Sequence, residues 1–264
     1  MRLVKLGGSV ITEKARPLAF RAQVTRRLAR ELAPSAGQGL VVVHGAGGFG
    51  HVRAAEYDLA NGLREAGQDM GVAIVQRDVR DLNIRVIDAL LEAGIPAVSV
   101  PAGSFLELED GRMARFDAIP FQRAIARGLV PVTFGDVLMD TERGVGIASG
   151  DLLMASLAAV FKPSMSVFVT RVDGVFDGDP DDPGAALLET VSPDGADVAG
   201  RSAGDGVADV TGSMGGKLAE AFQVAASSEE TWIIGGGRPG RLRALLEGRR
   251  VKGTRVLPPG GDAR

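Results

Sequence analysis

The chain has 264 residues, a formal net charge of −3 and no cysteine. This length is ample for a buried core and fits one large domain or two closely joined lobes. The slight negative charge argues against a broad nucleic-acid-binding face, and the lack of cysteine excludes disulfides and thiolate metal sites. No apolar run reaches about 18 residues, so we expect no membrane span. Because a strand pattern starts near the first residue, we expect no signal peptide and a cytoplasmic location.

Apolar runs alternate with helical patterns along the chain. The runs are short, rich in Val, Ile and Leu, and bounded by Gly, Pro or polar residues, which is typical of buried parallel strands. The predicted strands are 3–6, 40–44, 95–100, 129–134, 166–170 and 231–234; the predicted helices are 20–32, 69–92, 118–127, 151–161 and 217–227; two hairpins are predicted at 105–116 and 137–147. This alternation predicts an α/β fold with a mainly parallel sheet covered on both faces.

Glycine-rich turns follow the first two predicted strands. Gly7-Gly8-Ser9 comes shortly after Lys5, and residues 45–50 (GAGGFG) come directly before His51. Glycine turns at strand ends bring several backbone N–H groups close to a ligand, which suits phosphate oxygens. The sequence therefore predicts phosphate chemistry with a specific polar contact at His51.

The second turn also has the spacing of a dinucleotide-binding fingerprint, at Gly45, Gly47 and Gly50. That fingerprint needs an acidic residue about 20 positions further on, at the end of a second strand. Asp69 stands there, at the start of a helical pattern, so we do not expect a nicotinamide dinucleotide. The P-loop motif G-x-x-x-x-G-K-[ST] is absent from the sequence.

Four charged or titratable residues have positions that fit chemistry at the strand ends. Lys5 ends a strand, where it faces the ligand crevice of α/β sheets or, alternatively, solvent. His51 at a helix start can hold a phosphate oxygen or exchange a proton. His44 ends a buried strand, and we interpret it as structural. Asp151 at another helix start either organises catalytic lysines or a metal ion, or complements the helix dipole.

Two segments of the second half fit a nucleotide site. Residues 170–176 end a predicted strand, where a base and ribose can rest, and residues 209–217 (DVTGSMGGK) end in Lys217 at a helix start. Backbone N–H groups, a helix N-terminus and a lysine together bind anions.

In this order and at these spacings, the motifs resemble the amino acid kinase superfamily over nearly the whole chain, and within it the isopentenyl phosphate kinases. The superfamily motifs are KLGGS at 5–9, the glycine turn at 45–48, GD at 135–136, SGD at 149–151, VDGVF at 172–176 and the lysine that ends DVTGSMGGK. The features of the subfamily are Lys14 in KLGGSVITEK and FGH at 49–51.

The resemblance implies a three-layer α/β/α sandwich and a single amino acid kinase-like domain over 1–264, with an acceptor-binding lobe at about 1–148 and a nucleotide-binding lobe at about 149–258. It implies a homodimer that uses ATP and Mg²⁺ to phosphorylate isopentenyl phosphate to isopentenyl diphosphate. It assigns catalytic roles to Lys5, Lys14, His51, Asp151 and Lys217, nucleotide contacts to Lys5, Gly7, Gly8, Ser9, Gly47, Asp173, Ser213 and Lys217, and acceptor contacts to Ala46, Gly47, His51 and Gly135, with no protein ligand to the metal.

The chain departs from the family pattern at four positions. Ala46 replaces a usual glycine, Gly48 a usual serine, Arg171 a usual aspartate and Ser213 a usual glycine. None of these changes removes a catalytic side chain, so the implied chemistry stands.

Other functions remain open at this stage. A fosfomycin-type kinase shares the histidine and also phosphorylates a phosphorus oxyanion. One face of helix 69–92 fits either an apolar slot for an isopentenyl tail or ordinary core packing, and its residues are Val72, Val75, Val79, Leu82 and Val86. We expect the segment from Met70 to Val75 to lie over that tail. Lys14 and His51 argue against an amino-acid or uridylate kinase, and the three lysines with Asp151 argue against a nucleotide sensor without turnover.

Overall fold

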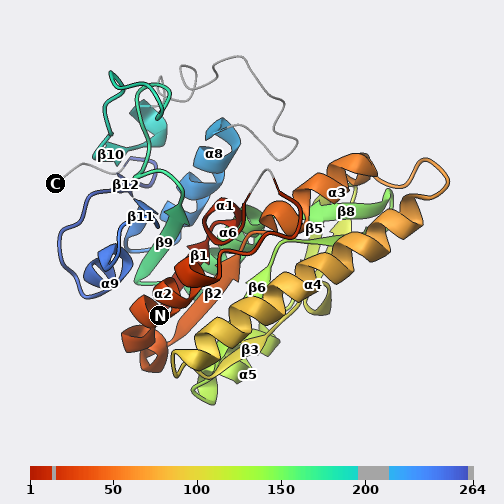
Figure 1. Cartoon of the computed structure of the whole chain (residues 1–264), viewed down its shortest axis with the longest axis horizontal. Coiled ribbons are helices and arrows are strands. Elements are labelled where there is room, and N and C mark those ends of the chain that lie inside the picture. Colours follow the sequence, from red (N-terminus) through yellow and green to blue (C-terminus); the bar gives the residue numbers. More distant parts are fainter. Residues whose placement is uncertain (14–15, 196–213, 261–264) are drawn as a thin grey trace.

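The computed structural model describes residues 1–13, 16–195 and 214–260, and of residue 195 and residues 214–217 it describes only the backbone. Its largest element is an eight-stranded sheet with β1 in its interior (Figure 1). From edge to edge, its strands are β10 (Thr190–Val191), β12 (Thr254–Val256), β11 (Thr231–Gly235), β9 (Met165–Thr170), β1 (Arg2–Leu6), β2 (Leu40–His44), β6 (Val130–Phe134) and β3 (Ala97–Ser99).

Most neighbouring strands of this sheet are parallel. β1 pairs in parallel with β2 and β9, β2 pairs with β6, and β9 pairs with β11, whereas β12 is antiparallel to β11. The carboxyl ends of β1, β2, β6, β9 and β11 therefore meet at one edge of the sheet. Open α/β sheets bind their ligands at this edge.

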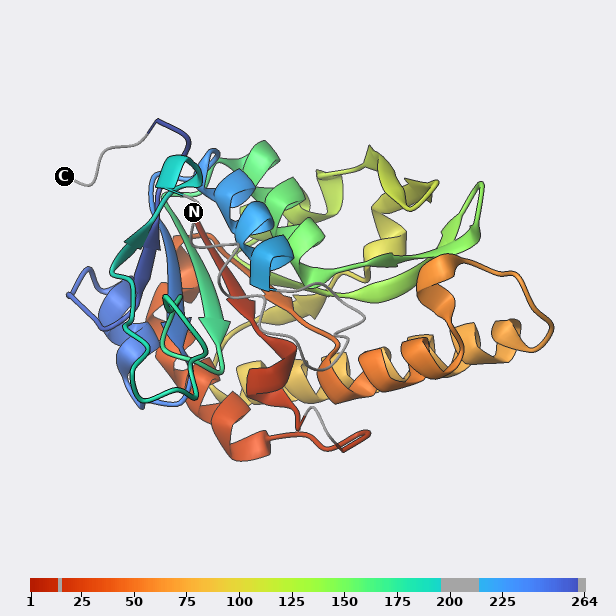
Figure 2. The same cartoon turned by 90° about the horizontal axis from the view of Figure 1, so that it is seen from above.

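Helices cover both faces of the sheet. They are α1 (Gly8–Ile11), α2 (Ala22–Leu32), α3 (His51–Glu56), α4 (Gln68–Glu92), α5 (Ile119–Ala126), α6 (Gly150–Phe161), α8 (Met214–Ala225) and α9 (Arg241–Leu246). Leu3 and Val41 pack towards α6 and α8, and Val4 and Val42 pack towards α2, α4 and α9. Successive strand residues point to opposite faces, so continuous apolar runs fill both cores. Figure 2 shows the sheet between these two helical layers, and the predicted three-layer α/β/α fold class is confirmed.

The two predicted hairpins form a second, four-stranded sheet. Its order is β5 (Arg112–Phe116), β4 (Leu106–Glu109), β7 (Asp136–Asp140) and β8 (Gly144–Ala148). The Asp140 carboxylate accepts backbone N–H bonds from both turns, at Gly111 (2.7 Å) and Arg143 (2.9 Å). One apolar cluster, made by Val72, Val75 and Val79 of α4 with Phe134, Val137, Val145, Ala54 and Leu59, joins this sheet to α4.

All predicted strands are present, with bounds that differ by at most two residues, and the predicted helices are present within three residues. The sequence does not predict β10, β12 or α9. Runs of two to six residues carry too little periodic signal to be recognised. The helix that begins at His51 ends at Glu56, and a 3₁₀ turn at Leu59–Asn61 separates it from α4.

None of the helices in the described part of the chain has the length and apolar character needed to cross a membrane. The eight-stranded sheet runs without a break from β9 to β1, across the predicted lobe boundary at residue 148. The division into two lobes therefore stays a proposal about ligand binding.

Candidate active site

The two glycine turns lie against each other at the carboxyl edge of the sheet. A Cβ atom built on Gly8 would lie 2.5 Å from the backbone nitrogen of Gly47, and one on Gly45 would lie 2.7 Å from that of Gly8. Gly47 also has a φ of +50°, which disfavours residues with a Cβ atom. Glycine is thus needed here so that two backbones can approach one another. The result is a single surface made of peptide groups from both turns.

Thr12 joins these turns, and the sequence analysis did not assign it a role. Its hydroxyl donates to the carbonyl of Gly8 (2.7 Å) and accepts the N–H of Gly48 (2.9 Å). The hydroxyl is buried, because Thr12 is fully excluded from solvent. Its position four residues after Gly8 was the available signal, since Ser and Thr in helices often bond the carbonyl four residues back.

Lys5 and Asp151 meet beside this surface. Their side chains form an ion pair and are 11% and 14% exposed. Asp151 lies in the first turn of α6, whose start is capped by the Ser149 hydroxyl, which accepts the Leu152 N–H at 3.0 Å. A Cβ on Gly150 would lie 3.2 Å from Lys5 Cε. The lysine of β1 thus meets the carboxylate and the N-terminus of α6, from two distant parts of the sequence. A lysine at a helix N-terminus favours the binding of an anionic ligand.

His51 follows the second turn and is the first residue of α3. The preceding Gly50 packs closely on Ala46, since a Cβ on Gly50 would lie 2.5 Å from Ala46 Cβ. Gly135 joins the same region from β6: its N–H donates to the carbonyl of His44 at 3.1 Å. The residues assigned to the acceptor thus come together around one turn. His44 itself is fully buried, and burial lowers its pKa to about 4 despite a hydrogen bond to Gly45.

Asp136, the second residue of the GD motif, is a buried carboxylate to which the sequence analysis assigned no role. Its side chain has no exposed surface, and its Oδ2 lies 3.1 Å from Nη1 of Arg80 in α4. Burial raises the pKa of Asp136 to about 6, although Arg80 and the Val137 N–H act in the opposite direction. A strand-end aspartate was visible in the sequence, but its burial and its partner depend on the packing of α4.

Asp173 lies at the end of β9 with two cations. Its carboxylate pairs with Arg241 and, at 3.1 Å, with Lys252. Burial opposes the ionisation of Asp173, but hydrogen bonds and attraction from Arg241 and Lys252 outweigh it and lower the pKa. Arg241 and Lys252 follow Asp173 by about 70 residues or more, so their proximity could not be read from the sequence.

Three assigned positions are not placed by the structure. Lys14 and Ser213 lie outside the described residues, as does the side chain of Lys217, whose backbone lies in α8. Within the described residues, no group of three His, Cys, Asp or Glu side chains is arranged to hold a metal ion.

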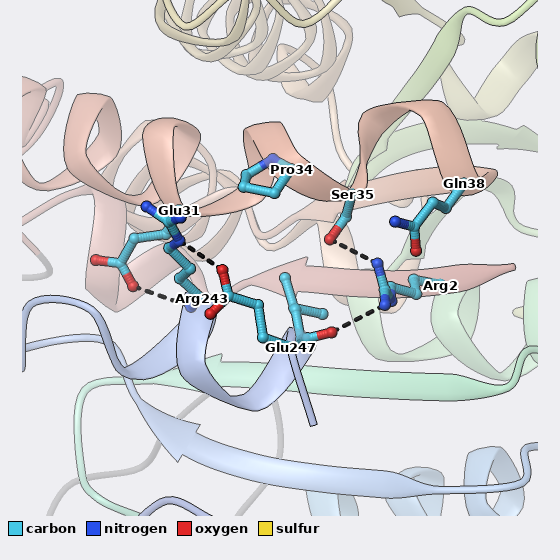
Figure 3. A pocket seen from close by; sticks show the side chains of 8 residues that line it. Arg2, Glu31, Pro34, Ser35, Gln38, Arg243 and Glu247 are labelled. Carbon is cyan, nitrogen blue, oxygen red and sulfur yellow. Dashed lines mark hydrogen bonds and ion pairs between the residues drawn. The ribbon is translucent and has the colours of Figure 1, made fainter. Parts of the chain in front are cut away.

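A separate hollow lies near the start of β1, far along the strand from the glycine turns. It is lined in part by Arg2, Glu31, Ser35, Arg243 and Glu247. Figure 3 shows that its charged groups are paired: Arg2 donates to Ser35, Arg243 donates to Glu247, and Glu31 accepts the Arg243 N–H. The bond between Glu31 and Arg243 joins α2 to α9, and the bond between Arg2 and Ser35 joins β1 to the segment after α2, so we assign the hollow a structural role.

This fold and this site define a class. The model of the amino acid kinase family matches residues 1–235, and the chain belongs to that family. The glycine turns, Lys5 and Asp151 all lie within the matched residues.

Two similar proteins identify the subfamily within the amino acid kinases. The chain is 36% identical to the isopentenyl phosphate kinase of Methanothermobacter thermautotrophicus, covering 97% of this chain and 98% of the relative. It is 38% identical to that of Thermoplasma acidophilum, covering 92% and 94%. Within the amino acid kinases, it belongs with the isopentenyl phosphate kinases.

Solved structures agree with this placement. One set of structures of isopentenyl phosphate kinase superimposes with a TM-score of 0.84 at 33% identity over 97% of this chain and all of that chain. A substrate complex of an isopentenyl phosphate kinase superimposes with a TM-score of 0.81 at 33% identity, over 97% and 100%. UMP kinase from Ureaplasma parvum, at 17% identity and a TM-score of 0.66, shares only the fold.

Proposed function

We propose that this chain transfers the γ-phosphoryl group of ATP to isopentenyl phosphate, giving isopentenyl diphosphate and ADP. The observation that carries the proposal is the joint surface of two glycine turns, with the Lys5–Asp151 pair and the start of α6 beside it. Backbone N–H groups, a lysine and a helix N-terminus are the groups that bind phosphates without covalent chemistry. The relatives name the acceptor.

The reaction needs positioning and neutralisation of charge. An acceptor phosphate is ionised at neutral pH, so its own oxygen attacks the γ-phosphorus and no general base is required. A new P–O bond forms to the acceptor, the bond between the γ-phosphorus and the bridging oxygen breaks, and ADP leaves with the electron pair. The obstacle is repulsion between two polyanions. We propose that Lys5 reduces this repulsion at the transferring group, together with Lys14 and Lys217, and that Asp151 orients Lys5.

The two turns contact different ligands for the most part. We propose that Gly7, Gly8, Ser9 and Gly47 line the ATP phosphates, and that Ala46, Gly47, His51 and Gly135 face the acceptor phosphate. We assign Asp173 and Ser213 to the nucleotide. Mg²⁺, held by the ATP phosphates, would supply further charge neutralisation; no side chain of the described residues is assigned to it.

The apolar cluster at α4 favours an alkyl tail on the acceptor. Ala46 of the second turn packs against this cluster, as do the half-buried Tyr57 and Ile147. Met70, which the sequence placed over the tail, is instead 62% exposed and outside the cluster. We therefore propose that Tyr57 and Ile147, rather than Met70, border the tail.

A coupled assay of ADP release tests the function. The purified chain is given ATP, Mg²⁺ and, in turn, isopentenyl phosphate, dimethylallyl phosphate, fosfomycin, glutamate and UMP. We expect the highest kcat/KM with isopentenyl phosphate. A clear preference for fosfomycin would reject the isoprenoid acceptor but keep a phosphate-accepting kinase, and turnover of glutamate or UMP alone would reject both.

The homodimer, the cytoplasmic location and the two lobes stay predictions of this proposal. Sedimentation velocity measures the first directly. Isothermal titration of ATP and of isopentenyl phosphate into variants of either half of the chain measures whether the two ligands are divided between the lobes.

A further inference from the structure

A chain of three polar side chains reaches the second glycine turn from behind. The hydroxyl of Ser99 at the end of β3 donates to Asn83 Oδ1 (2.6 Å), and Asn83 Nδ2 lies 3.2 Å from His44 Nε2. His44 Nδ1 lies 3.2 Å from the carbonyl oxygen of Gly45. His44 is fully buried and Asn83 is 3% exposed. The proposed reaction does not yet use any of these three side chains.

The direction of each hydrogen bond follows from the partners. A carbonyl oxygen only accepts, so Nδ1 of His44 carries the proton and donates to Gly45. The amide nitrogen of Asn83 only donates, so Nε2 of His44 accepts from it. The Ser99 hydroxyl donates to the amide oxygen of Asn83, which fixes the amide in this orientation. Every member is satisfied with a neutral imidazole, and the His44 ring is further held by stacking on Phe134 at 5.2 Å.

The hydrogen bond from His44 Nδ1 to Gly45 is the same at every pH near neutrality. Burial lowers the pKa of His44 to about 4, so the ring is neutral at the pH at which a cytoplasmic enzyme would work. The contacts of the ring are with neutral groups, namely Gly45, Asn83 and Phe134. Arg80, one turn before Asn83 in α4, pairs with Asp136. The ring thus holds one tautomer, and the bond to Gly45 does not vary with pH near neutrality.

The bond to Gly45 also sets the direction of the next N–H group. In a trans peptide the C=O and the following N–H point in opposite directions. The carbonyl of Gly45 points at His44, so the N–H of Ala46 points away from it. Gly45 itself is anchored, because its N–H donates to the carbonyl of Leu6 at 3.0 Å.

Glycine at position 45 makes such a restraint necessary. The approach to Gly8 leaves no room for a Cβ atom, so the position must be glycine. Glycine allows the following peptide to adopt orientations that other residues exclude. A side chain that holds one orientation removes this freedom before the ligand arrives.

We propose that His44 is a positioning residue for the acceptor: through the Gly45 carbonyl, and aligned by Asn83 and Ser99, it directs the Ala46 N–H at the acceptor phosphate. This inference rests on the proposed function, in which Ala46 contacts the acceptor. His44 touches neither ligand. Its effect is on the binding of the acceptor through Ala46, whereas the ATP phosphates lie against the first turn and Gly47.

Two substitutions separate the two ring nitrogens. In His44→Asn the amide nitrogen takes the place of Nδ1 and can donate to Gly45. In His44→Gln the amide oxygen takes the place of Nε2 and accepts from Asn83, and the bond to Gly45 is lost. We expect His44→Gln to raise the KM for isopentenyl phosphate by about 10-fold and His44→Asn by less than about 3-fold, with the KM for ATP within about 2-fold in both.

A second variant keeps the test independent of how well position 44 tolerates change. Asn83→Leu retains His44 but removes the donor to its Nε2, so that the proton is no longer held on Nδ1. We expect the KM for isopentenyl phosphate to rise by about 3-fold. Thermal unfolding of all variants is measured in parallel. A structural role alone would lower Tm equally in the Asn and Gln variants and raise both KM values together.

The outcomes separate the inference from the function. If wild type does not turn over isopentenyl phosphate, the proposed function fails. If wild type is active but His44→Asn and His44→Gln have the same acceptor KM, or Asn83→Leu leaves it unchanged, the positioning role of His44 is rejected and the function stands.

Discussion

The acceptor side and the nucleotide side of the proposed site are built differently. On the acceptor side, around residues 45–51 and Gly135, three polar groups behind the turn are neutral: His44 and Asn83 are buried, and Ser99 is exposed at the end of the chain of hydrogen bonds. On the nucleotide side, Asp173 lies between Arg241 and Lys252, where its side chain is 33% exposed. Hydrogen bonds between neutral groups fix the orientation of the backbone that they hold. Ion pairs near solvent keep their side chains charged, and salt weakens them.

The same difference is seen in the pKa values of Asp136 and Asp173. Burial without enough compensation raises the pKa of Asp136, whereas two cations outweigh burial and lower the pKa of Asp173. The same residue type at two strand ends therefore has opposite preferences for its charge. The environment of the strand end, rather than the residue type, therefore decides whether an aspartate there is readily ionised.

The largest effect is expected at Lys5, which lies between the two sides. We expect Lys5→Met to lower kcat by about 1,000-fold, or about 4 kcal/mol, because charge at the transferring group is greatest in the transition state. Steady-state kinetics with each substrate varied in turn measure this. Asp151→Asn is the matched variant and should lower kcat less, since Lys5 keeps its charge. A rise in the KM for ATP with kcat unchanged would show that Lys5 only binds nucleotide.

The next effect concerns stability at Asp136. Its folded pKa of about 6 exceeds the ordinary value of 3.8. Its contribution is thus fully present below pH 3.8 and is lost as pH rises through 6, a loss of about 3 kcal/mol at 1.36 kcal/mol per unit. Asp136→Asn does not titrate, so its free energy of unfolding should gain on that of wild type as pH rises. Urea unfolding from pH 4 to pH 8 measures the difference. Parallel curves for the two proteins would contradict the assignment.

Substitutions of His51 test whether this residue contacts the acceptor phosphate. We expect His51→Ala to lower kcat/KM for isopentenyl phosphate by about 100-fold while the KM for ATP changes little, because only the acceptor loses a hydrogen bond. His51→Gln should retain more activity, since an amide can still donate to phosphate. A loss smaller than about 10-fold, or about 1.4 kcal/mol, would show that His51 does not contact the acceptor.

A smaller effect is expected where the acceptor side meets the apolar cluster. Ile147→Ala makes room for a longer tail, and each buried CH₂ contributes about 0.8 kcal/mol. We expect the ratio of kcat/KM for geranyl phosphate to that for isopentenyl phosphate to rise about 5-fold. Met70→Ala is the control, because Met70 is exposed and outside the cluster. Equal ratios in both variants would place the tail elsewhere.

The smallest effect belongs to the nucleotide side. The lowered pKa of Asp173 means that its contribution to stability is present above pH 3.8 and is lost as pH falls through the lower folded value. We expect Asp173→Asn to lower stability at pH 7 by less than about 1 kcal/mol, because the group is partly exposed. High salt should reduce the difference. A Tm difference that grows with salt would contradict an ionic origin.

The sequence by itself determined the class of fold and the positions of most elements. The continuous apolar run at residues 40–44 and the periodic pattern of the 25-residue helix α4 are strong signals, so their predicted bounds agree with the structure. The glycine turns were recognisable because glycine is required where two backbones meet, and the spacing of the motifs identified the family. The sequence predicted that Met70 lies over the acceptor tail, whereas Met70 is 62% exposed and outside the apolar cluster. Periodicity gives a face of a helix but not the neighbour that the face meets.

Only the tertiary structure decided the contacts between distant residues. Thr12 joining the two turns, Arg80 facing Asp136, the two cations at Asp173 and the chain from Ser99 to Gly45 each join segments that lie apart in the sequence. Parallel strands bring such segments to one edge, and the side chains that meet there depend on packing, which no local pattern encodes. The sequence thus specified which groups were available for phosphate chemistry, and the packing of α4 and α6 on the sheet determined their directions and charges.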